Sequence, residues 1–249
     1  MPEMGSSAVR VLLLASLGSV AAYCHYTWVA PVDNLEIGKA STVRISHGDR
    51  FPVSEEAINA AQVDVYVLAP SGAKTKLAAT KGTGFVSAPF EPKEAGPHRI
   101  VLVQDRGITS RTPKGAKPGG RDRNPDAISA SRTFRTAVSY VSTNGAATAK
   151  GGKPVGLELE MIGEWSGSGW QVQLLKTGKP MGGVSVEVFL ASSGSAAATL
   201  KTGADGKIMF QPPAGAKGPA LFSAMFKDPA PSGAAYDAVN YETSLYVTW

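Results

Sequence analysis

The residues of this chain best suited to chemistry are its three histidines, His25, His47 and His98, together with one nearby acid, Asp49. A neutral imidazole nitrogen is a good ligand for nickel, cobalt and copper, and a carboxylate oxygen can complete such a site. Asp49 follows His47 by two residues, with a glycine between them, so one loop can carry both. We expect these four residues to be candidate ligands of a divalent transition-metal ion: nickel, cobalt or copper.

His25 gains a second ligand if the chain is cut directly in front of it. Residues 1–24 contain a basic flank at Arg10, a short apolar run and then small residues, the pattern of a secretory signal peptide. The apolar run is shorter than the roughly 20 residues needed to span a bilayer. Cleavage before His25 would free an α-amine that can chelate an ion together with the ring. Cleavage before Tyr23 and lipid attachment at Cys24 are the alternatives. We expect a protein exported to the periplasm or otherwise beyond the cytoplasm.

The histidines also have an ordinary structural interpretation. A histidine beside a glycine in a turn commonly serves only as a hydrogen-bonding loop residue, and His47 fits that description. His98 stands next to Arg99, and a neighbouring cation disfavours the binding of a second one. The sequence leaves both interpretations open.

Composition excludes several classes of site. A single cysteine excludes a disulfide framework and every multi-cysteine zinc or iron–sulfur site. The motifs Gly-x-Ser-x-Gly, the phosphate loop and His-Glu-x-x-His are absent, so we do not expect an enzyme. With 43% hydrophobic residues, 28 glycines and 17 prolines, the composition favours a loop-rich β protein.

Short β-branched and alternating runs separated by turn residues predict an all-β fold. We expect two tandem Ig-like β-sandwich domains, over residues 25–143 and 154–249, joined by a linker of small and polar residues at 144–153. Residues 131–140 have helical spacing and predict a short helix or a turn.

Trp28, Trp165 and Trp170 are expected in the cores, although the last two could instead form a platform for a sugar ring. The expected strands cover residues 25–31, 42–46, 63–68, 83–90, 96–103, 170–175, 183–189, 207–210, 220–226 and 245–249.

Positive charge is concentrated in one segment. Residues 106–135 contain eight basic and two acidic residues, a net charge of +6, whereas the whole chain has a net charge of +5. Residues 106–125 are rich in glycine and proline and predict a long exposed loop. This loop could bind anionic envelope polymers, or it could be a solvated insertion. Nucleic acid is not expected as a partner, because no aromatic residue is interleaved for base stacking.

Three strings of residues resemble the DUF4198 family of exported bacterial proteins. The first follows the signal segment, the second ends the next expected strand, and the third lies near the C-terminus. The matching residues are His25, Trp28, Val29 and Pro31; Gly38, Val43, Ile45, His47, Gly48, Phe51 and Pro52; and Gly178, Pro180, Gly183, Val184, Val186, Asp205, Gly206 and Phe210. The third string is also similar to Ig-like and carboxypeptidase-regulatory-like modules. Cys24 departs from the family pattern, which has a small residue at this position, and the segment around 106–123 is more basic.

The resemblance implies a periplasmic accessory of metal uptake, since the family has been linked to nickel. Such a protein would hold a divalent ion and pass it to a membrane metal transporter. The alternative from another class is a non-catalytic adhesion or scaffold module that contacts anionic envelope polymers through the basic loop. A more distant alternative is a copper oxygenase processed to an N-terminal histidine.

Overall fold

The structure is a computed structural model that describes residues 25–143 and 152–248. The expected signal peptide and residues 144–151 of the expected linker lie outside the described residues. No helix in the described ranges is long and apolar enough to cross a membrane. The elements are β1 (Tyr26–Pro31), β2 (Ser41–Gly48), the 3-10 turn η1 (Ala60–Gln62), β3 (Val63–Leu68), β4 (Lys74–Leu77), β5 (Thr80–Lys81), β6 (Val86–Phe90), β7 (Pro97–Thr112), β8 (Gly115–Pro118), β9 (Ser129–Ser142), β10 (Leu159–Trp165), β11 (Trp170–Lys176), β12 (Lys179–Pro180), β13 (Ser185–Leu190), β14 (Ala196–Lys201), β15 (Lys207–Phe210), β16 (Pro219–Pro229) and β17 (Ala238–Thr248).

The strands form three sheets. The N-terminal sheet has the order β1-β2-β6-β5, and the C-terminal sheet consists of β10, β11, β12 and β15. A nine-stranded central sheet has the order β14-β13-β16-β17-β9-β7-β3-β4, with β8 paired to β7. The expected all-β class is therefore confirmed.

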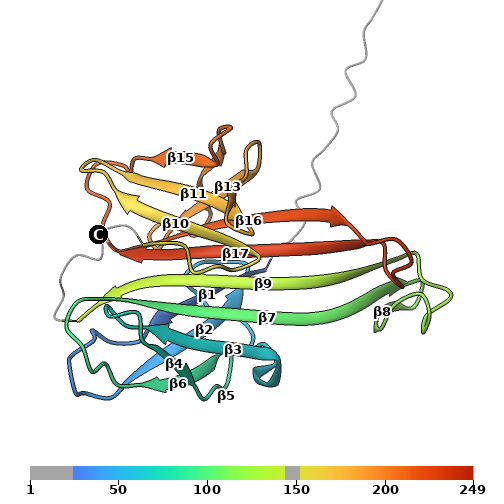
Figure 1. Ribbon diagram of the computed structural model, residues 1–249, viewed down its shortest axis with the longest axis horizontal. Coiled ribbons are helices and arrows are strands. Elements are labelled where there is room, and N and C mark those ends of the chain that lie inside the picture. Colours follow the sequence, from blue (N-terminus) through green and yellow to red (C-terminus); the bar gives the residue numbers. More distant parts are fainter. Residues whose placement is uncertain (1–24, 144–151, 249) are drawn as a thin grey trace, which may run out of the picture.

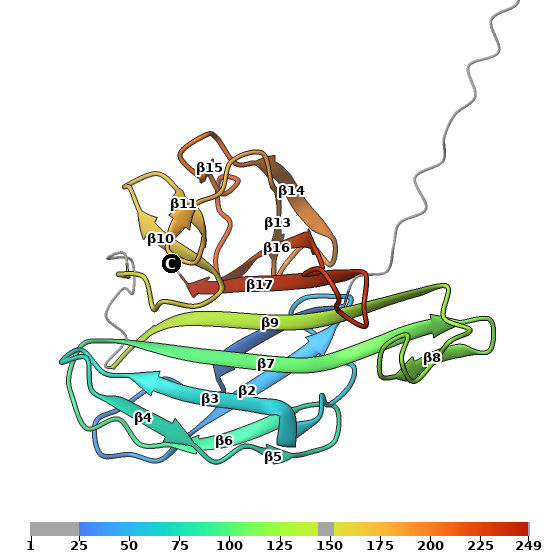
Figure 2. The same ribbon diagram turned by 45° about the vertical axis from the view of Figure 1, so that its right-hand side comes forward.

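The central sheet is covered on opposite faces by the other two sheets (Figures 1 and 2). Successive residues of β7 show why: Ile100 and Leu102 join the core beneath the N-terminal sheet, whereas Val101 joins the core beneath the C-terminal sheet. Side chains alternate between the two faces of a strand, so an unbroken apolar run can serve two cores.

The strands expected in two separate sandwiches meet in this one sheet. β9 pairs in parallel with β17 from Ser131 opposite Ala238 to Ser139 opposite Tyr246. A third apolar cluster ties β1 and the loop after β2 to β13 and β16. Its buried members are Trp28, Phe51, Phe189 and Leu221. The N-terminal strands are thereby packed directly against the C-terminal part of the chain.

The prediction of a helix or turn at residues 131–140 is wrong, because the segment lies within β9. The helical spacing of Phe134, Ala137 and Val138 arises because both faces of this strand are covered. Val138 packs in one core and Ala137 in the other. A strand that is apolar on both faces loses its period of two, which leaves the pattern ambiguous.

The prediction of a long loop at residues 106–125 is also wrong in its first half. β7 runs on to Thr112, β8 returns antiparallel to it, and residues 119–128 then lead into β9. A bulge between Asp105 and Ile108, where Gly107 has a φ of 72°, separates this extension from the rest of β7. The extension lies beyond the cores, so its residues are mostly polar. Its strands are held by backbone hydrogen bonds, which leave no hydrophobic periodicity in the sequence from which a strand could be predicted.

Trp170 lies at the centre of the C-terminal core, as expected. Its side chain is fully buried, and its ring meets the Trp165 ring edge-on at 5.6 Å between centroids. Its indole N–H has no hydrogen-bond partner among the described residues.

We expect Trp170→Ala to lower the free energy of unfolding by about 3–5 kcal/mol, because it leaves a large cavity. Trp170→Phe should cost clearly less, because it keeps an aromatic ring and removes the unpartnered N–H. Urea unfolding of both variants measures the difference. Equal losses in the two variants would contradict a packing role for the ring.

Candidate metal centre

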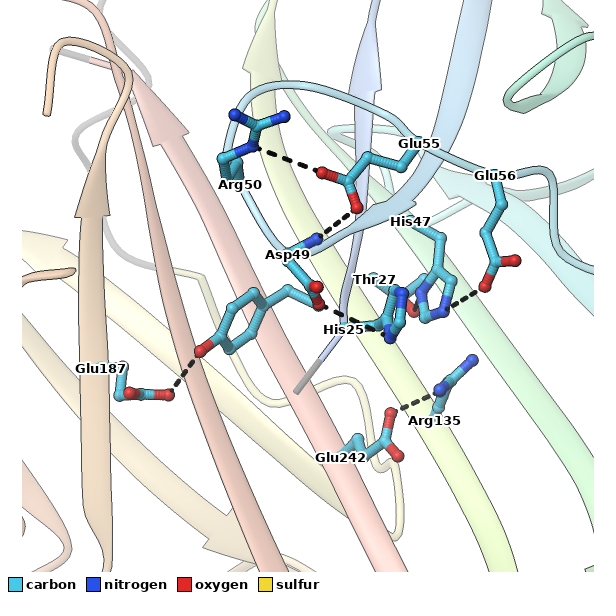
Figure 3. Close-up of polar contacts among 11 residues, drawn as sticks. His25, Thr27, His47, Asp49, Arg50, Glu55, Glu56, Arg135, Glu187 and Glu242 are labelled. Carbon is cyan, nitrogen blue, oxygen red and sulfur yellow. Dashed lines mark hydrogen bonds and ion pairs between the residues drawn. The ribbon is translucent and has the colours of Figure 1, made fainter. Parts of the chain in front are cut away.

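The pairing of β1 with β2 brings His25 and Asp49 together. Thr27 lies opposite His47 and Tyr26 lies opposite Gly48, so the next pair in this register is His25 with Asp49. The His25 Nδ1 atom lies 3.5 Å from the Asp49 Oδ1 atom (Figure 3). Oδ1 is buried and accepts no hydrogen bond from any described residue. The carboxylate thus keeps an unsatisfied oxygen aimed at an imidazole nitrogen.

The loop after β2 adds a third candidate ligand, the carboxylate of Glu55. Ligand atoms of His25, Asp49 and Glu55 all lie within 4.8 Å of one another. Glu55 is held there by its own N–H, which donates to the His47 carbonyl at 2.9 Å, and by the Asp49 N–H, which donates to its Oε2 atom at 3.1 Å. The turn requires Gly48, because a Cβ there would meet the Val53 carbonyl oxygen at 2.9 Å. Sequence reasoning missed Glu55, since its spacing from the histidines is not a ligand pattern.

His47 supports the ring of His25. The two rings are stacked with their centroids 5.0 Å apart and their planes 19° from parallel. His47 Nδ1 shares a hydrogen bond of 2.9 Å with the Thr27 hydroxyl, and Nε2 faces Glu56 at 3.4 Å. The lone pairs of stacked rings lie in separate planes. In this arrangement His47 therefore acts as a platform for His25 and does not share an ion with it.

Burial keeps His47 neutral. Its side chain is only 5% exposed, and burial, reinforced by the charge of Arg135, lowers its pKa from 6.5 to about 3. The Glu56 side chain is 62% exposed, so its solvated carboxylate does not offset this effect. The ring next to His25 is thus an uncharged base at every pH near neutrality.

An ion pair between the buried Arg135 and the half-buried Glu242 lies beneath the two rings. Arg135 of β9 donates through Nε to Glu242 of β17, across the parallel pairing that joins the two parts of the chain (Figure 3). A cavity of about 10 Å³, large enough for one water, is lined by both residues and by His25, Thr27 and Met225. The floor of the centre is therefore built by strands from both halves of the sequence.

His98 does not join the other expected ligands. It is buried in β7, where its Nδ1 lies 3.0 Å from the Gly96 carbonyl and its ring meets Phe90 edge-on. Its strand partner is Val141, six residues along β9 from Arg135, which is a distance of roughly 20 Å. His98 is thus a core histidine and leaves the set of candidate ligands.

The remaining centre offers one imidazole nitrogen and two carboxylate oxygens. This mixed donor set suits borderline divalent ions such as nickel, cobalt and copper(II), and it contains no thiolate or thioether among the three ligands to favour copper(I). The side chains of His25 and Asp49 are 41% and 26% exposed, so the centre is open to solvent. An open centre can exchange its ion, whereas structural metal sites are closed.

Comparison with known proteins identifies the family of the chain. The model of the family described as "Domain of unknown function (DUF4198)" matches residues 22–228. Among solved structures, the D0-D1 domain of intimin is 16% identical over 90% of this chain and 97% of its own, with a TM-score of 0.20. That score is too low to support any conclusion about this chain. No curated protein matches the sequence.

Proposed function

We propose that this chain, which belongs to the DUF4198 family, is an exported protein that binds one divalent transition-metal ion as an accessory to metal uptake. His25, Asp49 and Glu55 hold the ion, which is nickel, cobalt or copper(II). The observation that carries the proposal is the unsatisfied, buried Oδ1 of Asp49, 3.5 Å from the Nδ1 of His25. A cation between these atoms satisfies the oxygen and uses the lone pair of the nitrogen.

The identity of the ring nitrogen also supports a role for the α-amine. Nδ1, not Nε2, faces Asp49, and Nδ1 is the ring nitrogen closer to the backbone. An ion bound to Nδ1 and to a free α-amine of the same residue closes a six-membered chelate ring. Cleavage before His25 would supply that amine. The complete donor set is then two nitrogens from His25 and one oxygen from each carboxylate.

The electrostatics of the centre favour a bound cation. Asp49 and Glu55 lie close enough to repel each other, and among the described residues the nearby cation is Arg50, whose Nε lies 3.5 Å from Glu55 Oε1. The basic partner of Asp49 is the His25 imidazole, also at 3.5 Å, and this ring must be neutral to bind a metal, so a divalent ion relieves the repulsion more fully than these two partners do. The exposure of the centre supports a cargo that is taken up and passed on to a membrane transporter.

The test is a calorimetric titration of two matched proteins with nickel, cobalt(II) and copper(II) chlorides. One protein begins at His25, and the other carries one additional alanine before it. We expect the first to bind one ion per chain, and we expect the extension to weaken binding at least about tenfold, because the chelate with the α-amine is lost. Binding no stronger than millimolar for all three ions would refute the proposal. Equal affinity of the two proteins would remove the α-amine from the donor set.

A further inference from the structure

The extension of β7 and β9 forms an arm that projects beyond the sheets. The arm comprises residues 107–130, with β8 as its third strand, and both views show it extending away from the packed layers (Figures 1 and 2). It contributes no member of the three apolar cores. Its role must therefore be sought at its own surface.

The tip of the arm is rigidly built without a core. The buried Asn124 amide donates to the carbonyls of Pro118, Gly119 and Gly120 at 3.0–3.3 Å. Arg121 donates through two nitrogens to Asp237, each at 2.8 Å, and through Nη1 to the Ala127 carbonyl at 2.7 Å. Such a tip is preorganised, so a partner that binds it does not have to order it first.

Among the residues that the structure describes, three cations of the arm have no acidic partner. Arg121 is paired with Asp237, and Lys117 lies 4.0 Å from Asp126. Arg111, Lys114 and Arg123 are exposed and form no ion pair with any described residue.

An exposed apolar side chain lies beside one of these cations, Arg111. Ile128 is 59% exposed, and its N–H donates to the carbonyl of Arg111 at 2.8 Å, so the two residues are backbone neighbours across the arm. Each unpaired cation near an anionic bilayer is attracted to its surface, and an aliphatic side chain beside such a cation adds apolar area at the boundary between headgroups and acyl chains.

We propose that the tip of this arm docks onto the surface of an anionic lipid bilayer. Arg111, Lys114 and Arg123 contact headgroup phosphates, and Ile128 enters the interface between headgroups and acyl chains. Residues 107–130 contain no aromatic side chain, which disfavours a glycan or a nucleic acid, since both are usually bound by ring stacking. The proposal does not depend on the metal centre.

The test is co-sedimentation of the chain from His25 onward with vesicles of phosphatidylcholine, with and without about one third phosphatidylglycerol. We expect binding to the anionic vesicles only, and we expect it to weaken steeply as salt shortens the reach of exposed charges. The triple variant Arg111→Gln/Lys114→Gln/Arg123→Gln should bind on the order of a hundredfold more weakly, since each charge near such a surface contributes roughly fivefold. Ile128→Ser should weaken binding without changing its salt dependence.

A matched control removes three exposed lysines far from the arm in the sequence, Lys81→Gln/Lys179→Gln/Lys217→Gln, and changes the net charge equally. This control should retain most of the binding. Equal losses in the two triple variants, or equal binding to neutral vesicles, would overturn the proposal. Binding to a soluble anionic polysaccharide but not to vesicles would do the same and would identify a polymer as the partner.

Discussion

His25→Ala and Asp49→Asn should each weaken binding of nickel or copper(II) by at least about a thousandfold. Mutating a residue that only hydrogen-bonds to a metal ligand already lowers metal affinity 10- to 100-fold. His25→Ala removes a donor atom and Asp49→Asn removes the charge of one, so their effects should be larger. His25→Ala also opens one side of the stacked pair of rings, whereas Asp49→Asn keeps the shape of the loop. The second variant is therefore the cleaner probe of the ion itself. Calorimetry with each metal chloride measures the change.

Two controls separate the centre from a general effect of charge or of histidine content. Asp33→Asn removes an exposed carboxylate outside the centre, and His98→Gln removes the buried histidine that lies away from it. Both should bind metal as the parent does, provided that circular dichroism shows that they are folded. If Asp49→Asn binds as tightly as Asp33→Asn, the ion is held elsewhere. If His98→Gln loses metal binding while His25→Ala and Asp49→Asn keep it, His98 is a ligand and His25 and Asp49 are not.

The second large effect is a loss of stability in mild acid. The pKa of His47 is about 3 in the folded chain and 6.5 in its unfolded reference. Between these values the unfolded chain binds a proton that the native chain does not, so the free energy of unfolding falls as the pH falls. The contribution of His47 is fully present above pH 6.5 and is lost toward pH 3. It amounts to about 5 kcal/mol in total, of which about 2 kcal/mol is lost by pH 5.

Urea unfolding at pH 7, 6 and 5 measures this loss, with His47→Gln as the reference. The variant carries no titrating group at this position, and its amide can still bond to the Thr27 hydroxyl. It should be less stable than the parent at pH 7 but should lose little further stability down to pH 5. Acidic groups with lowered pKa values, such as Asp105 and Asp237, lose their contributions below their ordinary values near 3.8, outside this window. If the free energy of unfolding depends on pH equally in parent and variant, His47 binds its proton as readily in the native chain as in the unfolded chain, and the prediction is wrong.

Local pattern was sufficient for the strands that have one core face and for selecting His25 and Asp49 as candidate ligands, whose role in metal binding stays a prediction. Val43 and Ile45 alternate with polar residues, and both are buried in the core beneath the N-terminal sheet. The sequence predicts both strands, one over residues 25–31 that begins at His25 and one over residues 42–46 that ends next to His47. Their antiparallel pairing explains why residues 24 positions apart approach each other. The position of Trp170 in a core followed from the same kind of pattern.

What the sequence could not provide depends on contacts between distant segments. β9 is apolar on both faces because one face packs in the core beneath the N-terminal sheet and the other in the core beneath the C-terminal sheet. The hydrophobic periodicity of the segment alone does not reveal this. The arm is held by backbone pairing of polar residues, which has no signature in hydrophobicity. Glu55 reaches the centre only because the turn at Gly48 folds the chain back onto the carbonyl of His47. His98 has the same chemistry as the other histidines, and only its strand register sets it apart.

The parallel pairing of β9 with β17 affects how the chain matures. β17 begins at Ala238, roughly a hundred residues after β9 ends at Ser142. At a synthesis rate of about 5–20 residues per second, the hydrogen-bonding edge of β9 waits on the order of 5–20 seconds for its partner. During that time a long, partly apolar strand edge can pair with a neighbouring chain and seed aggregation. Keeping the β9 edge unpaired with other chains until β17 is synthesised avoids this hazard.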